Sequence, residues 1–246
     1  MPDRDGKLRS VPERWELEAL IEKVASGAIR VPLFSRPFVW RPRQMTALFE
    51  SIEDGYPIGS LVLWEPADEV ESMNEIGGIP IPPPPPGLPI CYVLDGHQRL
   101  ATLFGCLRAP ASAQASADAW MWRIYRVLGL RLSRESRYRH SGPVEAPPHW
   151  LPLRSVLRTK DFLSYQRVLT GIARGEELEE LLHEAYDVSH RIKDYRIPVV
   201  RVIGGSPSQA TTVFSRLNSA GLSLTVDEQA TAHEYTDGSE SAQDSG

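Results

Sequence analysis

The feature that most constrains the fold is a short apolar run that is followed at once by a helical pattern. Ile90 to Leu94 is continuously apolar and has the length of a strand, which is typical of a strand buried on both faces. After Asp95 to Gln98, apolar residues recur with helical spacing at Leu100, Leu103, Phe104 and Leu107. The sequence therefore predicts a buried strand that turns directly into an amphipathic helix.

Similar reasoning predicts the other elements along the chain. Apolar spacing at i, i+3, i+4 and i+7 indicates helices over 17–24, 43–54, 161–192 and 207–217. Short apolar runs between turn residues indicate strands over 29–33, 58–64, 120–127, 128–132 and 196–202. Helices and strands are therefore expected to share one chain, with residues 11–235 as the folded domain and 236–246 as a disordered polar tail.

Composition limits the class of protein. The chain has 246 residues, of which 41% are hydrophobic and 24% charged, enough for one large domain with an insertion. The net charge of -5 argues against a protein that wraps nucleic acid over most of its surface. A local basic patch that contacts phosphate is still compatible with this charge. Without a signal sequence or a membrane-length apolar run, we expect a cytoplasmic protein with no membrane partner, in which Cys91 and Cys106 are buried free thiols.

A proline run interrupts the pattern between residues 79 and 89. Ile79 to Gly87 contains six prolines in nine residues and cannot donate a full ladder of hydrogen bonds. It predicts a stiff polyproline II excursion on the surface. The run is interpreted as a connector, with a docking ligand for an aromatic groove as the alternative.

The segment from Asp95 to Arg99 is the candidate functional site. A helix that starts directly after a strand leaves backbone N–H groups free to hold an anion. Gly96 would let a ligand approach the main chain, and Arg99 would add a planar guanidinium suited to phosphate. Asp95 would orient Arg99, hold a divalent cation or position a water molecule. The structural alternative is a capping box, with Asp95 as the N-cap and Gln98 at N3.

The same five residues, Asp-Gly-His-Gln-Arg, resemble the DGQQR signature of the DUF262 family. That family is the N-terminal domain type of GmrSD-like modification-dependent restriction enzymes and of related phage-defence proteins. Three further segments resemble its motifs in the same order: VPLFSRPFVW at 31–40, YPIGS at 56–60, and FSRLN at 214–218 with Gly221 and Leu224. The resemblance covers nearly the whole chain.

The resemblance implies an α+β fold with a ParB/sulfiredoxin-like core: a small mixed sheet, packed helices and an inserted strand and helix region. It also implies that the signature binds a nucleoside triphosphate, supports its hydrolysis in several members, and so controls the cutting or nicking of DNA. Carried over by position, the catalytic candidates are Asp95, His97, Gln98 and Arg99. The nucleotide-binding candidates are Arg36, Gly96, Arg99, Thr102 and Asn218, and Asp95 is the candidate ligand for Mg²⁺.

Two positions depart from the family pattern. His97 replaces the first glutamine of the signature, which makes this position titratable near neutral pH, and Ser35 stands where the first motif usually has glutamine. Arg36 is kept as a phosphate contact, with a surface ion pair as the alternative. Asn218 is read either as a ligand-facing amide or as a helix C-cap, and Trp40 as a core aromatic.

A basic stretch is the second candidate site. It has six arginines and one acid between residues 123 and 139, interleaved with tryptophan and tyrosine, which is compatible with a phosphate-tracking and base-stacking surface. The alternative is a solvated strand and loop. The candidate nucleic-acid contacts are Arg123, Arg126, Arg131, Arg134, Arg137 and Arg139.

These features lead to three functional hypotheses. The first is a nucleoside-triphosphate-binding module of a restriction or phage-defence system, with NTP hydrolysis as its enzymatic activity and Mg²⁺ as cofactor. The second is a non-catalytic DNA-binding or regulatory module, and the third is a DNA-nicking enzyme acting through Asp95 to Arg99. The sequence has neither a GxxxxGK[ST] motif nor a clustered His-Asn-His nuclease site, so DNA cleavage is expected to need a separate nuclease or modification-enzyme partner.

Overall fold

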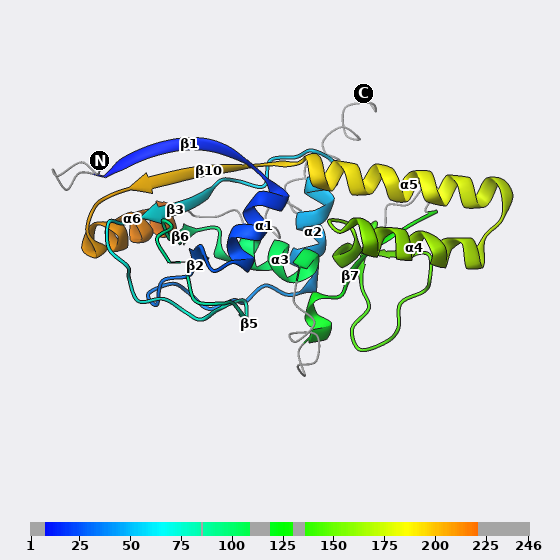
Figure 1. The fold of residues 1–246 in the computed structure, drawn as a ribbon, viewed down its shortest axis with the longest axis horizontal. Coiled ribbons are helices and arrows are strands. Elements are labelled where there is room, and N and C mark those ends of the chain that lie inside the picture. Colours follow the sequence, from blue (N-terminus) through cyan, green and yellow to red (C-terminus); the bar gives the residue numbers. More distant parts are fainter. Residues whose placement is uncertain (1–7, 85, 109–118, 130–135, 221–246) are drawn as a thin grey trace, which may run out of the picture.

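The computed structural model describes residues 8–84, 86–108, 119–129 and 136–220, so the tail at 236–246 lies outside the described residues. Helices and strands alternate along the chain (Figure 1), which confirms the α+β class. The elements are β1 Arg9–Glu16, α1 Leu17–Ala25, β2 Ile29–Arg30, α2 Pro42–Glu53, β3 Leu61–Glu65, β4 Glu75–Ile76, β5 Ile79–Pro80, β6 Cys91–Asp95, α3 His97–Arg108, η2 Ala119–Trp122, β7 Ile124–Val127, β8 Tyr138–His140, β9 Trp150–Pro152, η3 Leu153–Ser155, α4 Thr159–Ile172, α5 Gly175–Asp194, β10 Arg196–Ile203 and α6 Pro207–Ala220.

A mixed five-stranded sheet organises the fold, in the order β1-β10-β3-β6-β2. β1 is antiparallel to β10, β10 is parallel to β3, β3 is antiparallel to β6, and β6 is parallel to β2. Since β3 and β6 run in opposite directions, the start of β3 lies beside the end of β6, where Val62 pairs with Asp95. This register places the segment before β3 next to the segment after β6 at one end of these two strands.

Side chains of β3 and β6 alternate between two apolar layers, as the period of a strand requires. Leu61 and Leu63 of β3, with Cys91 and Val93 of β6, belong to the larger core, which α1, α2 and α3 cover. Their neighbours belong to a smaller core on the other face, which Ala210 and Phe214 of α6 complete: Val62, Trp64, Tyr92 and Leu94. Both faces are buried, as the continuous apolar run of β6 predicts.

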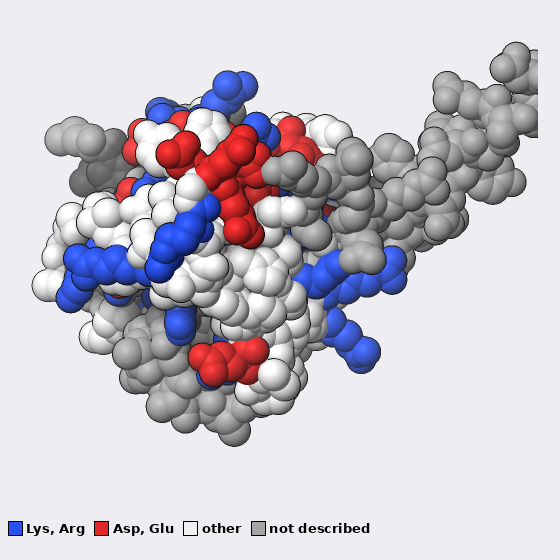
Figure 2. All heavy atoms as spheres, turned by 90° about the vertical axis from the view of Figure 1, so that its right-hand side faces the viewer, with Lys and Arg blue, Asp and Glu red and all other residues white. Residues whose placement is uncertain are grey.

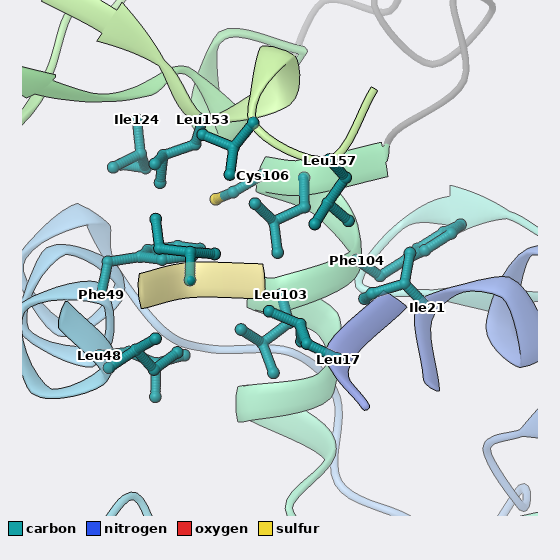
Figure 3. Packing of buried hydrophobic residues seen from close by; sticks show 14 of the residues in the cluster. Leu17, Ile21, Leu48, Phe49, Leu103, Phe104, Cys106, Ile124, Leu153 and Leu157 are labelled. Carbon is teal, nitrogen blue, oxygen red and sulfur yellow. The ribbon is translucent and has the colours of Figure 1, made fainter. Parts of the chain in front are cut away.

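The larger core continues beyond the sheet (Figure 3). Side chains from α1, α2 and α3 meet Ile124 of β7, Leu153 of η3 and Leu157 in one continuous cluster. Ile124 and Leu153 are at most 2% exposed. The three-stranded sheet β8-β7-β9 and the helices α4 and α5, drawn at the right of Figure 1, therefore share their core with the main sheet.

The structure differs from the expected elements at several places. The strand expected over 120–127 begins with the 3-10 helix η2, and only Ile124–Val127 form the strand β7. Residues 9–16 form the edge strand β1, which was not expected. Its half-buried residues alternate with exposed ones, but the charged residues among them hide this pattern in the sequence. The helix expected over 161–192 is two helices, because Ala173 and Arg174 are extended and Gly175 has φ +57°. The strand expected over 128–132 does not form at Leu128 or Gly129, and residues 130–132 lie outside the described part. Edge position and helix breaks depend on long-range packing, which local periodicity does not report.

The proline run was expected to be a surface excursion, but its first residues are attached to the fold. Ile79 and Pro80 pair with β4 as a short hairpin, and Ile79 and Ile81 are buried. The buried guanidinium of Arg30 donates to the carbonyl oxygen of Pro82 at 2.9 Å, and to Ser72, Met73 and Asn74. The run is thus fastened to the core through Ile79, Ile81 and the carbonyl oxygen of Pro82, while Pro80, Pro82 and Pro83 are exposed.

Two further expectations concern membranes and thiols. In the described part of the chain, none of the helices combines the length and the apolar character that a bilayer crossing requires. Cys91 and Cys106 are free and buried, as predicted. Burial raises the pKa of the Cys91 thiol to about 11 and raises that of Cys106 further, so both thiols stay protonated and unreactive at neutral pH.

Candidate functional site

Arg99 joins the end of β6 to the start of β3. Its Nη1 donates to the carbonyl oxygen of Ile58 at 2.6 Å, and its Nη2 pairs with Asp95 Oδ2 at 3.0 Å. Gly59 makes room for this contact: its φ is +78°, and a Cβ there would lie 2.6 Å from Arg99 Nη1. The YPIGS segment and the Asp95 to Arg99 segment therefore form one unit.

Gly96 is required by packing as well as by its backbone. Its φ is +90°, and a Cβ would lie 2.3 Å from Leu61 Cδ2. The sharp turn between β6 and α3 therefore rests directly on β3. Ligand access, the role expected from the sequence, stays a prediction at this position.

The start of α3 leaves backbone donors available. Leu100 N–H donates to the carbonyl oxygen of Gly96 at 2.9 Å, which makes Gly96 the N-cap. The N–H groups of His97, Gln98 and Arg99 have no acceptor in the described residues. The expected capping box is absent, because Gln98 and Asp95 direct their side chains to other partners.

Gln98 and His97 hold residues 36–40, a segment that we call the strap. Gln98 Oε1 accepts from the N–H groups of Val39 at 2.8 Å and Trp40 at 3.2 Å, and Gln98 Nε2 donates to the carbonyl oxygen of Pro37 at 2.9 Å. His97 Nδ1 lies 3.0 Å from the carbonyl oxygen of Arg36. A carbonyl only accepts, so Nδ1 carries the proton and donates.

A pocket of about 670 Å³ lies between the strap, the end of β6, the start of α3 and α6. This volume is in the range of small-molecule sites. Segments from all four family-like motifs meet here, since Arg99, which lines the pocket, is itself bonded to Ile58. The lining residues are Ser35, Arg36, Pro37, Val39, Trp40, Val93, Leu94, Asp95, Gly96, His97, Gln98, Arg99 and Phe214.

The pocket has a polar part and an aromatic part. The guanidinium of Arg36 is exposed and has no partner in the described residues, so the alternative of a surface ion pair does not apply to it. Ser35 is 8% exposed, and its Oγ has no hydrogen-bond partner. Trp40 and Phe214 supply rings, and Phe214 meets Phe34 edge to face at 5.4 Å. Trp40 also packs against the larger core, as expected.

Burial shifts two pKa values in the pocket. Desolvation lowers the pKa of His97 from its ordinary 6.5, against the opposing effect of its bond to Arg36. The ring is therefore neutral at physiological pH, with Nε2 as a free acceptor that is buried and unpartnered. Desolvation also lowers the pKa of Arg99, which Asp95 opposes, and the guanidinium stays charged.

One of the expected nucleotide contacts, Thr102, lies away from the pocket, and a second, Asn218, is placed only by its backbone. Thr102 is fully buried, and its hydroxyl donates to the carbonyl oxygen of Gln98 at 2.9 Å, away from the pocket lining. Asn218 lies inside α6 and not beyond its end, so the helix does not stop at this residue. Its side chain is outside what the structure describes.

Asp95 is the single acidic residue of the described pocket lining. Its side chain is 42% exposed and uses one oxygen on Arg99. Among the described residues, no group of three or more His, Cys, Asp and Glu side chains gathers as a metal site would require. One carboxylate combined with phosphate oxygens and water is nevertheless a common way to hold Mg²⁺.

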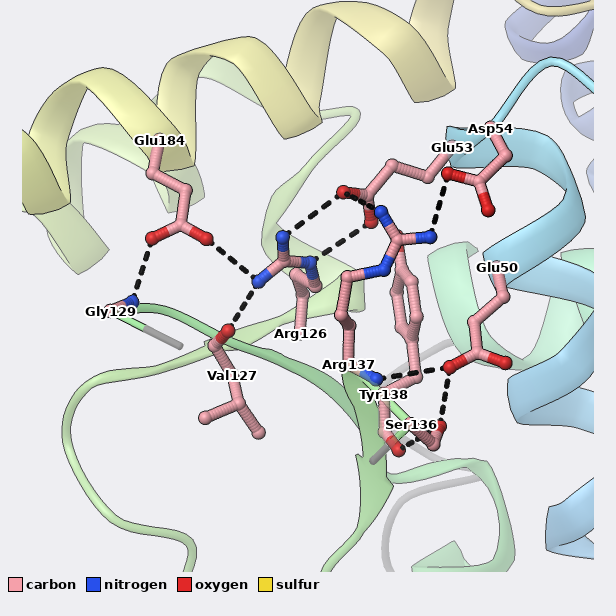
Figure 4. A network of polar contacts seen from close by, with 10 residues as sticks. All are labelled: Glu50, Glu53, Asp54, Arg126, Val127, Gly129, Ser136, Arg137, Tyr138 and Glu184. Carbon is pink, nitrogen blue, oxygen red and sulfur yellow. Dashed lines mark hydrogen bonds and ion pairs between the residues drawn. The ribbon is translucent and has the colours of Figure 1, made fainter. Parts of the chain in front are cut away.

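The arginine stretch is divided between internal and external roles (Figure 4). Arg126 is 5% exposed and is paired with Glu53 at 2.9 Å and Glu184 at 2.9 Å. Arg137 is paired with Glu53 at 3.2 Å and Asp54 at 2.7 Å. The Arg126 guanidinium thus links β7 to α2 and α5 inside the protein, whereas Arg137, whose side chain is 32% exposed, pairs with the end of α2 nearer the surface.

The other arginines of the stretch are distributed differently. Arg123 is exposed and has no ion-pair partner in the described part, Arg139 has a partner, and Arg131 and Arg134 lie outside the described residues. Two of its aromatic residues, Trp122 and Tyr138, are buried in the core. Figure 2 shows, in addition, that acidic side chains gather along the top of this end of the molecule, where α5 lies. Among its described residues, the stretch therefore does not form one continuous basic surface.

Sequence reasoning missed the structural role of the strap and of the Ile58 carbonyl group. The available signal was Gly59, which stands before an apolar run where a side chain would be usual. The strap has no regular secondary structure, so periodicity gives no information on its partners.

Comparison with known proteins identifies the family of this chain. The model of the family described as "GmrSD restriction endonuclease, N-terminal domain" matches residues 17–233. An uncharacterised protein from Methanocaldococcus jannaschii is 25% identical over 232 residues, which cover 83% of this chain and 39% of that protein. The chain thus spans well under half the length of this relative. From the family match over most of its length, the chain belongs to the N-terminal domain family of the GmrSD restriction endonucleases.

Proposed function

We propose that this domain binds a nucleoside triphosphate in the pocket between the strap and α3, as the nucleotide-dependent module of a DNA restriction or phage-defence system. The observation that carries the proposal is that several hydrogen-bond donors without acceptors line the same pocket. Three N–H groups at the start of α3 and the guanidinium of Arg36 are without acceptors in the described residues. Such a set favours a multiply charged anion.

The two parts of the pocket suit the two parts of a nucleotide. The phosphate chain would lie at the start of α3, within reach of Arg36 and of the N–H donors that Arg99 does not use. The rings of Trp40 and Phe214 offer faces for a nucleobase, and stacking of this kind tolerates different bases. Ser35, which is buried and unpartnered, is a candidate for a further polar contact.

Asp95 is the residue that would share Mg²⁺ with the phosphates. Its carboxylate keeps one oxygen clear of Arg99, and it is the only acid among the described lining residues. When bound, Mg²⁺ would offset the charge of the phosphate oxygens. Arg99 holds Asp95 in place through its 3.0 Å ion pair.

Titration with Mg²⁺ complexes of ATP, GTP, CTP and UTP tests the proposal directly. Arg36→Ala is the informative variant, because its guanidinium makes no hydrogen bond or ion pair with a described residue, so its loss should leave the fold intact. Loss of a charge-assisted contact of about 1.5–3 kcal/mol raises Kd about 10- to 150-fold. Arg123→Ala, an exposed arginine outside the pocket, is the matched control and should bind as the parent does.

Phosphate release by the same proteins measures whether bound nucleotide is hydrolysed. An absence of binding by the parent to all four nucleotides would reject the proposal. Equal affinity of Arg36→Ala and the parent would also reject the site, even if a nucleotide binds elsewhere.

A further inference from the structure

The strap depends on two side chains of α3. Four hydrogen bonds join residues 36–40 to the first turn of α3, and all four use side-chain atoms of His97 and Gln98. The strap has no regular secondary structure of its own. Its backbone therefore takes its place at the pocket largely from these bonds.

Gln98 is almost fully used within the protein. Its Oε1 accepts two backbone hydrogen bonds and its Nε2 donates one, at 2.8, 3.2 and 2.9 Å. An amide can make about four such bonds, so one N–H is left. A glutamine engaged in this way replaces the missing strand partners of residues 37–40 and has little capacity to position a water molecule or a substrate.

His97 holds the strap at Arg36, the residue proposed to bind the anion. Its Nδ1–H donates to the carbonyl oxygen of Arg36 at 3.0 Å, and the Arg36 guanidinium points to no described partner. The ring thus fixes the backbone of Arg36 while the side chain stays available.

The far side of the strap is held separately. The ring of Phe38 packs on Trp122, with centroids 5.1 Å apart, and Phe38 and Trp40 both contact the larger core. Loss of the Gln98 bonds would therefore free the backbone from Pro37, the neighbour of Arg36, to Trp40 without detaching the whole segment.

We infer that His97 and Gln98 are positioning residues that fasten the strap to α3 and thereby hold Arg36 over the phosphate site. This inference rests on the proposed function, and it differs from the catalytic role expected for both residues. It predicts that Gln98 acts on the nucleotide only through Arg36.

A double-mutant cycle tests this dependence. Nucleotide affinity is measured for the parent, Gln98→Ala, Arg36→Ala and the double variant, with whichever of the four Mg²⁺ nucleotides the parent binds best. We expect each single change to raise Kd about 10-fold or more, and the double variant to bind no more weakly than Arg36→Ala. Gln166→Ala, on α4 and outside the pocket lining, is the control and should bind as the parent does.

A second pair of variants isolates the Nδ1 atom and does not depend on the stability of Gln98→Ala. Asparagine places an amide N–H near the position of His Nδ1, whereas leucine fills similar space without a donor. His97→Asn should therefore keep the affinity of the parent, and His97→Leu should lose about as much as Gln98→Ala. Thermal unfolding of each variant checks that the native state is populated.

The outcomes separate the two proposals. If the parent binds no nucleotide, the proposed function fails. If Arg36→Ala weakens binding and Gln98→Ala does not, the proposed function stands and the positioning role is wrong. A double variant weakened by the product of the two single effects would also overturn it, since Gln98 would then contact the nucleotide independently.

Discussion

Gly96 combines a left-handed backbone with close packing, since a Cβ there would lie 2.3 Å from Leu61 Cδ2. Gly55 has a similar backbone, with φ +74°, but nothing lies within 4 Å of its hypothetical Cβ. We expect Gly55→Ala to cost about 1–2 kcal/mol for the left-handed conformation alone. Gly96→Ala should cost about 1–3 kcal/mol more, because the methyl group meets Leu61. Urea unfolding of both variants measures the difference, and equal costs would show that packing at Gly96 is relaxed.

His97 gives a pH dependence whose sign follows from its burial. Its native pKa is lowered from 6.5, so on acidification the unfolded chain takes up a proton before the native state does. The stabilisation is complete above about pH 6.5 and is lost as pH falls toward the native pKa. The free energy of unfolding should therefore fall less between about pH 7 and pH 5 in His97→Asn than in the parent. Parallel slopes in urea titrations would contradict the assignment.

The residues of the site could be found from the sequence, but their partners could not. The turn after β6, the free helix start and the arginine of the signature follow from local pattern. The bonds of Gln98 to Val39, 59 residues away in sequence, and of Arg99 to Ile58 depend on the sheet register. Local pattern favoured a capping box for Gln98, because long-range acceptors and donors do not appear in a local window.

At the scale of elements, a buried ion pair joins α2 to β7. Glu53 and Arg126 have side chains that are 4% and 6% exposed, and two hydrogen bonds link them. Arg126→Ala should destabilise the protein by about 3–5 kcal/mol, because Glu53 would lose its main partner inside the core. Arg123 precedes Arg126 in the sequence and is exposed. Arg123→Ala should therefore change stability by about 0.5 kcal/mol or less.

Chemical unfolding of these two variants, followed by circular dichroism, checks the expectation. A small effect of Arg126→Ala would mean that water or Arg137, which also contacts Glu53 at 3.2 Å, replaces the lost partner. The same unfolding measurements distinguish two kinds of arginine in the arginine stretch. Arg126 is expected to support the fold, whereas Arg123 is expected to be available to a ligand.

Helices and central strands were predicted well because their apolar residues face the core. α1, α2, α3 and α6, and strands β3, β6 and β10, lie close to the expected ranges. The edge strand β1 was missed because its residues are mostly exposed and charged. The division of α4 from α5 was missed because the apolar spacing continues across a break of two residues.

At the scale of the whole molecule, one core links the main sheet to the region of β7, β9, α4 and α5. Leu153→Ala, at a fully buried position of η3, should cost about 2–5 kcal/mol. Because the core is shared, the change should move one cooperative transition, with equal calorimetric and van't Hoff enthalpies. Differential scanning calorimetry that resolved two transitions, only one of them shifted, would show two independent units.

Strand order also has a consequence for how the protein is made. β10, residues 196–203, lies between β1 and β3, so its place in the sheet stays empty while a ribosome synthesises the preceding residues. α6, which closes the pocket with Phe214, emerges later still. Since domains of high contact order fold only after distant segments meet, the pocket is expected to stay incomplete until synthesis has passed this helix. The proposed nucleotide site would therefore form only late in translation.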